Sequence, residues 1–234
     1  VDEGLVPAGD KVTIVNIECP CGMVVAEVAM HDGKAAEVSF NSVPSFLFAR
    51  DQTLDLQPWG KISYDIAYGG AFYALADARQ FGLRFGRDPA QAFVEAADRL
   101  TKAAAGAAKL AHPDADDLAF LYGSILTDGR DAFSPQPTRN VCVFAERQVD
   151  RSPTGSGVTA RLAAMHARGQ IAPGQERLFE SIIGTRFTGS VASVTQAGAH
   201  AAITARVAGR AFYSGSATFR VEDDDPLSGG FLVR

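Results

Sequence analysis

The sequence predicts an α+β protein in which largely antiparallel sheets wrap around or pack on helices. Three patterns predict this class: short apolar runs broken by glycine-containing turns, one long segment with apolar residues at helical spacing, and a second helical segment behind a Gly-Ser-Gly turn. The 234 residues are 47% hydrophobic and 21% charged, which is the composition of a globular chain with a sizeable core.

The first third of the chain predicts an antiparallel meander followed by a linker. Asp32-Gly33 suits a two-residue hairpin turn, because Gly33 tolerates the positive φ that such turns require. Residues 51–60 are polar and end in Pro-Trp-Gly, so we expect a linker there. The expected strands of this part cover residues 11–19, 23–30, 35–40, 61–68 and 71–76.

Two helices are expected in the rest of the chain. The first runs from Asp88 to about Ala111, with Asp88 as its cap and Pro89 at the first helical position. The second covers residues 155–168 and stops at Gly169. The apolar stripe of the first helix consists of Phe93, Ala97, Leu100 and Ala104.

Further strands flank the second helix. Apolar runs at 119–126 and 140–144 predict two buried strands. From Phe187 onward, short apolar runs alternate with glycine, serine and proline breaks, which predicts four or five strands.

Charge and composition exclude several function classes. A formal net charge of -5 disfavours nucleic-acid binding, because a phosphate backbone requires an excess of basic residues. No apolar run is long enough for a membrane span, so we expect no membrane partner. Three cysteines make no disulfide scaffold and favour a reducing cytoplasm. The four histidines are scattered without ligand spacing, so we expect no metal.

The turn before the second helix carries the most informative chemistry. Gly155, Ser156 and Gly157 present backbone N–H groups at a helix N-terminus, which suits a carboxylate or phosphate. Asp150 lies just before the turn and can hold an ammonium group, so the pair of features fits a zwitterion. Thr154 lies at the mouth of the turn. The alternative is that Ser152 or Thr154 only caps the helix and Asp150 forms an ordinary turn.

Four sequence blocks resemble the proline racemase family. The block most typical of an active site in that family is Asp150-Arg-Ser-Pro-Thr-Gly-Ser-Gly157. The other three blocks are Val43-Pro-Ser-Phe46, Asp65-Ile-Ala-Tyr-Gly-Gly70 with Phe72, and Glu180-Ser-Ile-Ile-Gly-Thr185 with Phe187. Because the blocks occur in the family's order from about residue 10 onward, the resemblance covers nearly the whole chain.

The resemblance implies a fold like that of diaminopimelate epimerase, with two pseudo-symmetric lobes and the substrate between them. It implies a small imino acid substrate, no cofactor, a homodimer and a cytoplasmic location. It also places Phe144 against the substrate ring. We expect residues 1–50 to be a remnant of an incomplete N-terminal lobe, residues 51–225 to form the C-terminal lobe, and residues 226–234 to form a tail that returns to the first lobe.

Racemases and epimerases of the family use two cysteines on opposite sides of the α-carbon, and this sequence departs from that pattern twice. Thr154 stands where the second cysteine is expected, as in the family's trans-3-hydroxy-L-proline dehydratases. The motif of the first cysteine is expected upstream of Val1. Cys19 and Cys21 lie in a strand turn, and we expect both, like Cys142, to be structural.

The sequence therefore predicts a cofactor-independent hydro-lyase. The resemblance implies that it removes the α-proton and the 3-hydroxyl of trans-3-hydroxy-L-proline to give Δ1-pyrroline-2-carboxylate. Thr154 and Asp150 are the expected catalytic residues, and Asp150, Phe144, Gly155, Ser156 and Gly157 are the expected substrate-binding residues. The alternatives are a proline racemase or 4-hydroxyproline epimerase, and an inactive fragment that only binds an imino acid.

Overall fold

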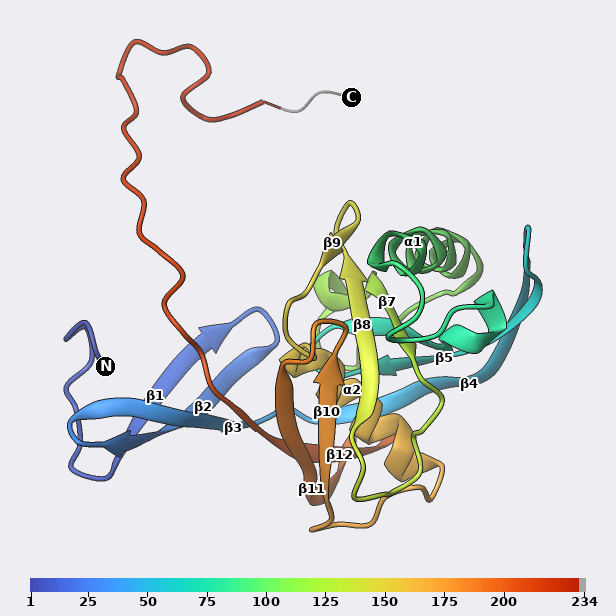
Figure 1. The fold of residues 1–234 in the computed structure, drawn as a ribbon, viewed down its shortest axis with the longest axis horizontal. Helices are drawn as coiled ribbons and strands as arrows, with labels where there is room; N and C mark the ends of the chain where they lie inside the picture. Colours follow the sequence, from blue (N-terminus) through green and yellow to red (C-terminus); the bar gives the residue numbers. More distant parts are fainter. Residues whose placement is uncertain (232–234) are drawn as a thin grey trace.

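The computed structural model describes residues 1–231 and contains twelve strands and two α-helices (Figure 1). The helices are α1 (Ala90–Ala107) and α2 (Gly155–Ala167), and short 3₁₀ turns cover Ala78–Phe81 and Asp116–Leu118. The strands are β1 (Val12–Cys19), β2 (Gly22–His31), β3 (Lys34–Asn41), β4 (Ser45–Leu56), β5 (Gly60–Tyr68), β6 (Phe72–Asp77), β7 (Leu121–Thr127), β8 (Thr138–Phe144), β9 (Gln148–Val149), β10 (Glu176–Ser181), β11 (Arg186–Ala197) and β12 (His200–Gly209).

The strands form one sheet that closes on itself. Its order is β1-β2-β3-β12-β11-β10-β8-β7-β6-β5-β4, and β4 also pairs with β12. The strands from β12 to β4 therefore make a barrel, and β1 to β3 extend from it as an antiparallel meander (Figure 1). The pairs β6–β7 and β8–β10 are parallel, and the other pairs are antiparallel. This confirms the predicted α+β class with a mostly antiparallel sheet.

Helix α2 is the central helix of the barrel. Nine of its thirteen residues are buried, and it contacts β4, β5, β6, β11 and β12. Helix α1 packs against β7 and β8 with the predicted stripe, which is fully buried. Neighbouring residues of one strand pack on opposite sides of the sheet. Ile66 of β5 belongs to the hydrophobic cluster that contains the buried residues of α1, whereas Ala67 belongs to the cluster that contains Ala160 of α2. Strands covered on both faces read as continuous apolar runs, which explains the sequence pattern of β6 and β8.

The structure corrects three details of the predicted elements. The expected linker at 51–60 is wrong, because β4 continues to Leu56 with its polar residues exposed and a register shift beside Asp51, whose φ is 52°. Asp88 does not cap α1, because its carboxylate accepts from the Arg84 amide and pairs with Arg87; Pro89 is the N-cap. Helix α1 ends at Ala107, before the expected Ala111.

The C-terminal region holds two strands among its described residues, where four or five were predicted. The long strands β11 and β12 include several of the small-residue breaks, and Gly198 forms the turn between them. Residues 210–231 form neither helix nor strand and extend away from the barrel (Figure 1). Residues 232–234, the end of the expected tail 226–234, lie outside the described residues. The division into two lobes stays a prediction.

Within residues 1–231, neither helix combines the length and the apolar character that crossing a bilayer demands.

Candidate active site

The turn between β9 and α2 is held by hydrogen bonds among its own polar groups. Asp150 accepts from the Ser152 amide through Oδ1 and from the Thr154 hydroxyl through Oδ2, each at 2.8 Å. The Ser152 hydroxyl accepts from the Thr154 amide at 3.0 Å. Thr154 has φ 71° and ψ 111°, a conformation that is costly for a residue with a branched side chain. The turn therefore fixes both the backbone and the hydroxyl of Thr154.

The structure bears out one half of the capping alternative and contradicts the other: Asp150 does close a local turn through the Ser152 amide, but no side chain caps the helix. Thr154 is the N-cap residue of α2, but its side chain makes no capping hydrogen bond to the helix. The Ser152 hydroxyl is also used before the helix begins. The amides of Gly155 and Ser156 are therefore left for a ligand at the positive end of the helix dipole.

A cavity of about 630 Å³ opens in front of this turn. Five of the six residues predicted for the site line it, namely Phe144, Asp150, Thr154, Gly155 and Ser156. Gly157 is buried and does not line the cavity; a Cβ at this position would lie 2.7 Å from Cδ1 of Ile125. The glycine there is required by packing, so its predicted contact with substrate has no support from the cavity geometry.

Two glycines allow close packing at the first turn of α2. A side chain on Gly69, in the β5–β6 connection, would collide with the backbone of Ser156 and Ala160. A Cβ on Gly155 would lie 3.2 Å from the Phe40 ring. The Gly69-Gly70 pair is thus a tight strand connection, as the sequence indicates, and it also packs against the site.

Tyr73 is a site residue that sequence reasoning missed. It lies on β6, is 1% exposed, and its hydroxyl is 2.7 Å from Oγ of Ser156. Burial raises the pKa of Tyr73 above its ordinary value, so the phenol stays protonated at neutral pH. The strand pattern gives no signal for this contact, because it joins residues 83 positions apart.

The cysteines divide into two groups. Cys19 and Cys21 were expected to be structural, but both are partly exposed and line the same cavity as Thr154. Burial and the neighbouring Cys19 raise the pKa of the Cys21 thiol. Cys142 on β8 is fully buried, and burial raises its pKa to about 12, which fits the structural role predicted for it.

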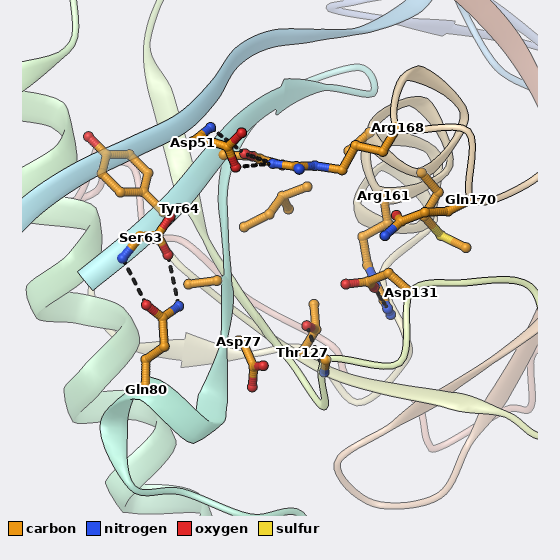
Figure 2. Close-up of a pocket in the computed structure, with 16 residues that line it drawn as sticks. Asp51, Ser63, Tyr64, Asp77, Gln80, Thr127, Asp131, Arg161, Arg168 and Gln170 are labelled. Atoms are coloured by element: carbon orange, nitrogen blue, oxygen red, sulfur yellow. Dashed lines mark hydrogen bonds and ion pairs between the residues drawn. The ribbon is translucent and has the colours of Figure 1, made fainter. Parts of the chain in front are cut away.

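A second cavity, of about 320 Å³, lies near the C-terminal end of α2 (Figure 2). Asp65 of β5 lines this cavity, where it accepts from Arg168 at 2.6 Å. Arg168 also pairs with Asp51, so the two carboxylates hold the end of α2 against β4 and β5 (Figure 2). Tyr68, at the end of β5, is 1% exposed and lines neither cavity.

Comparison with known proteins identifies the relatives of this chain. The family model described as proline racemase matches residues 1–232. The chain belongs to the proline racemase family. This confirms the resemblance that the four sequence blocks indicate.

Named relatives include both dehydratases and isomerases. The chain is 48% identical to the human trans-3-hydroxy-L-proline dehydratase, with all of this chain and 68% of the human protein covered. It is 36% identical to the proline racemase of Clostridioides difficile, with 100% and 70% covered. The chain thus spans about two thirds of the length of these relatives.

Solved structures of the family share the fold. A hydroxyproline epimerase from Agrobacterium vitis with bound trans-4-OH-L-proline has a TM-score of 0.90 at 33% identity, covering 99% of this chain and 66% of that one. A probable proline racemase from Agrobacterium radiobacter with bound carbonate has a TM-score of 0.91 at 31% identity, covering 99% and 67%. The predicted fold is therefore confirmed.

Proposed function

We propose that this chain is a trans-3-hydroxy-L-proline dehydratase, a hydro-lyase of the proline racemase family that forms Δ1-pyrroline-2-carboxylate. The observation that carries the proposal is Thr154, which lines the cavity at the first turn of α2 where the family's isomerases are expected to carry a cysteine. The 48% identity with the human dehydratase supports the same activity.

The geometry supports a defined order of charge development. Removal of the α-proton places negative charge on the substrate carboxylate, and the amides of Gly155 and Ser156 at the helix N-terminus stabilise that charge. The electron pair of the α C–H bond then forms the ring double bond while the bond from C3 to the hydroxyl oxygen breaks. The hydroxide takes up a proton, which balances the one removed from the α-carbon, and leaves as water. The enamine becomes the cyclic imine when its N–H proton moves to C3.

Thr154 contacts the substrate and does not act as a general acid. Its hydroxyl proton points to Asp150, so its oxygen keeps lone pairs that can accept a hydrogen bond from the 3-hydroxyl group and orient that group for departure. A threonine hydroxyl is too weak an acid to return a proton to the α-carbon, which disfavours racemisation. We assign the removal of the α-proton to the cysteine of the family's first motif, as the resemblance implies.

Asp150 has two roles in this proposal, one inside the turn and one toward the substrate. Both of its carboxylate oxygens already accept hydrogen bonds inside the turn, yet the residue lines the cavity. A carboxylate has about four acceptor sites, so an imino nitrogen can still donate to it. We propose that Asp150 binds the substrate ammonium while it orients Thr154, and that Phe144 packs against the ring.

We further propose a cytoplasmic homodimer that uses no cofactor and no metal and binds neither nucleic acid nor a membrane. Light scattering coupled to gel filtration tests the dimer, with a single-chain mass as the contradicting result. Unchanged turnover after extensive dialysis against a chelator is expected if no metal is used, and loss that Mg²⁺ or Zn²⁺ restores would contradict it.

The activity is tested on the complete protein, which includes the first cysteine motif, by proton NMR in D₂O with trans-3-hydroxy-L-proline, L-proline and trans-4-hydroxy-L-proline in parallel tubes. The proposal predicts loss of the 3-hydroxyproline signals with growth of the pyrroline carboxylate signals, and no inversion of the other two substrates. Exchange or inversion at the α-carbon of L-proline or trans-4-hydroxy-L-proline would instead support the second candidate, an isomerase, which the 36% identity with a proline racemase favours. Silence in all three tubes would support a chain that only binds an imino acid.

A further inference from the structure

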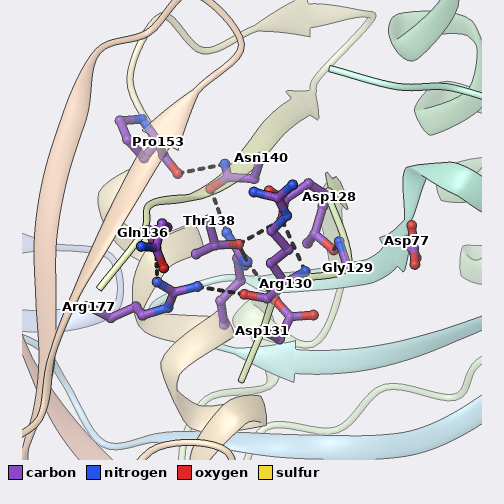
Figure 3. Close-up of polar contacts among 12 residues, drawn as sticks. Asp77, Asp128, Gly129, Arg130, Asp131, Gln136, Thr138, Asn140, Pro153 and Arg177 are labelled. Carbon is purple, nitrogen blue, oxygen red and sulfur yellow. Dashed lines mark hydrogen bonds and ion pairs between the residues drawn. The ribbon is translucent and has the colours of Figure 1, made fainter. Parts of the chain in front are cut away.

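A buried side chain outside the cavity makes a hydrogen bond to the peptide that joins Pro153 to Thr154. The side-chain amide of Asn140, on β8, donates from Nδ2 to the Pro153 carbonyl at 3.0 Å (Figure 3). Asn140 is fully buried and does not line the cavity. Its contact with the site therefore runs through the backbone just before Thr154.

The orientation of the Asn140 amide is set by Arg161 of α2. Arg161 donates from Nη1 to Oδ1 of Asn140 at 2.9 Å, so the opposite end of the amide, Nδ2, must face Pro153. Arg161 is itself 1% exposed and is fixed through Nη2, which donates to Thr138 at 2.7 Å and to Asp131 at 2.6 Å. These two hydrogen bonds fix the position of the guanidinium group, and so fix the atom that donates to Asn140.

Thr154 requires such support because its backbone is strained. A positive φ of 71° persists in a threonine only when the surroundings over-determine it. A peptide unit moves as a plane, so the Pro153 carbonyl and the Thr154 amide turn together. Rotation of this plane would remove the Thr154 amide from Ser152 and the Thr154 hydroxyl from Asp150.

We propose that Asn140 and Arg161 are positioning residues for Thr154, which set the direction of its hydroxyl without touching substrate. The inference rests on the proposed function, because it assigns Thr154 to the chemical step. Its consequence is that disturbing the Asn140–Pro153 bond slows dehydration while binding of the ring carboxylate is kept.

The test compares Asn140→Asp with Thr138→Val. The aspartate keeps the size and the partner for Arg161, but it places an acceptor against the Pro153 carbonyl, so that bond is lost. The valine removes a different buried partner of Arg161 and leaves the Asn140–Pro153 bond in place, which makes it the matched control.

Two readouts are taken on each variant. For Asn140→Asp we expect kcat to fall at least about tenfold with KM within about threefold, since small misplacements of reacting groups slow catalysis strongly. The backbone amide resonances of Thr154 and Gly155 in ¹H–¹⁵N spectra should shift. For Thr138→Val both readouts should stay close to those of the unmodified protein, because Arg161 is still held by Asp131 and still donates to Asn140. If Asn140→Asp does not fold, Asn140→Ser takes its place, because its hydroxyl is too short to reach Pro153.

The outcomes separate the two proposals. A folded Asn140→Asp protein with unchanged kcat and unchanged Thr154 amide overturns the inference, and so does an equal loss in Thr138→Val. If the unmodified protein does not dehydrate the substrate, the proposed function fails, and the amide resonances alone decide the positioning role. A Thr154 shift in Asn140→Asp but not in Thr138→Val then supports it, and the absence of that difference refutes it.

Discussion

Thr154 donates its hydroxyl proton to Oδ2 of Asp150 across 2.8 Å, and the same carboxylate accepts the Ser152 amide through its other oxygen. Asp150 therefore stabilises the turn before α2 and also orients the Thr154 hydroxyl. Because the proton of Thr154 points to Asp150, the threonine oxygen is left to act as an acceptor. This relationship separates the site from one that returns a proton to the α-carbon, and it gives the first prediction.

Replacement of Asp150 by asparagine should reverse that hydrogen bond. The asparagine keeps the shape and can accept from Ser152, but its amide group cannot accept the Thr154 proton. We expect the dehydration kcat to fall at least about tenfold and the free energy of unfolding to fall by about 1.5–3 kcal/mol, the usual contribution of a hydrogen bond to a charged group. Steady-state kinetics and urea unfolding measure both. The control is Asp55→Asn, an exposed aspartate remote from the cavity, and equal losses in the two variants would contradict the role of Asp150.

Replacement of Thr154 by cysteine in the complete protein should change the reaction outcome. A thiol can both remove and return a proton at neutral pH, whereas a hydroxyl cannot. We expect slower dehydration of trans-3-hydroxy-L-proline and new exchange at the α-carbon of trans-4-hydroxy-L-proline in D₂O. Thr154→Ser keeps the hydroxyl and should retain part of the dehydration without any exchange. Dehydration at an unaltered rate in Thr154→Cys would place Thr154 outside the chemistry.

Alkylation of Cys21 should occlude the cavity in a pH-dependent manner. The raised pKa of this thiol lowers its thiolate fraction at pH 7, so the rate of reaction with iodoacetamide should rise steadily as the pH is increased above 8. A carboxamidomethyl group would project into the space in front of Ser156, and turnover should be lost in step with modification. Peptide mass spectrometry should find Cys142 unmodified in the folded protein, since it is buried. Full activity after complete modification of Cys21 would be the opposing result.

The Glu180 carboxylate should contribute stability that acid removes. Burial alone would raise the pKa of Glu180, but hydrogen bonds from Arg186 and Arg139, at 2.9 and 2.7 Å, outweigh it and hold the pKa below the ordinary 4.5. A carboxyl group whose pKa is lower in the folded than in the unfolded protein stabilises the fold at every pH above its unfolded pKa. This stabilisation is lost as the pH falls through the folded pKa. Glu180→Gln should lower the free energy of unfolding at pH 7 by about 1–3 kcal/mol, because it removes hydrogen bonds to a charged group.

The check on Glu180 is urea unfolding at pH 7, 5, 4 and 3. The difference between the unmodified protein and Glu180→Gln should persist at pH 7 and 5 and shrink below about pH 4.5 as the native carboxyl takes up a proton. Glu176→Gln, an exposed glutamate of the same strand, should show a small effect at every pH. A difference that is constant from pH 7 to pH 3 would show that the carboxylate charge is not the source of the stability.

The local parts of the fold and site could be predicted because the residues that decide them are close in sequence. Asp32-Gly33 sets the β2–β3 hairpin, and 148–157 contains the aspartate, the threonine and the free amides of the turn. Residues 51–60 could not be assigned in this way. Their polar side chains read as a linker, yet they face solvent along β4 where the barrel supplies the hydrogen bonds of the strand.

The non-local parts of the site depend on barrel closure, which no sequence window contains. Tyr73 reaches Ser156 because β6 packs against α2, and Cys21 reaches the cavity because the β1–β2 turn lies near the β5–β6 connection. Gly157 shows how a local motif can have a packing role instead. Its place in a Gly-Ser-Gly turn suggests a ligand contact, while the structure assigns it to packing against Ile125.

The most direct measurement is a crystal structure with pyrrole-2-carboxylate, a planar ring carboxylate that imitates the flattened α-carbon formed when the proton leaves. The account predicts the carboxylate on the amides of Gly155 and Ser156, the ring against Phe144 and the ring nitrogen toward Asp150. A ligand bound instead in the second cavity, between Arg161 and Arg168, would contradict the account (Figure 2).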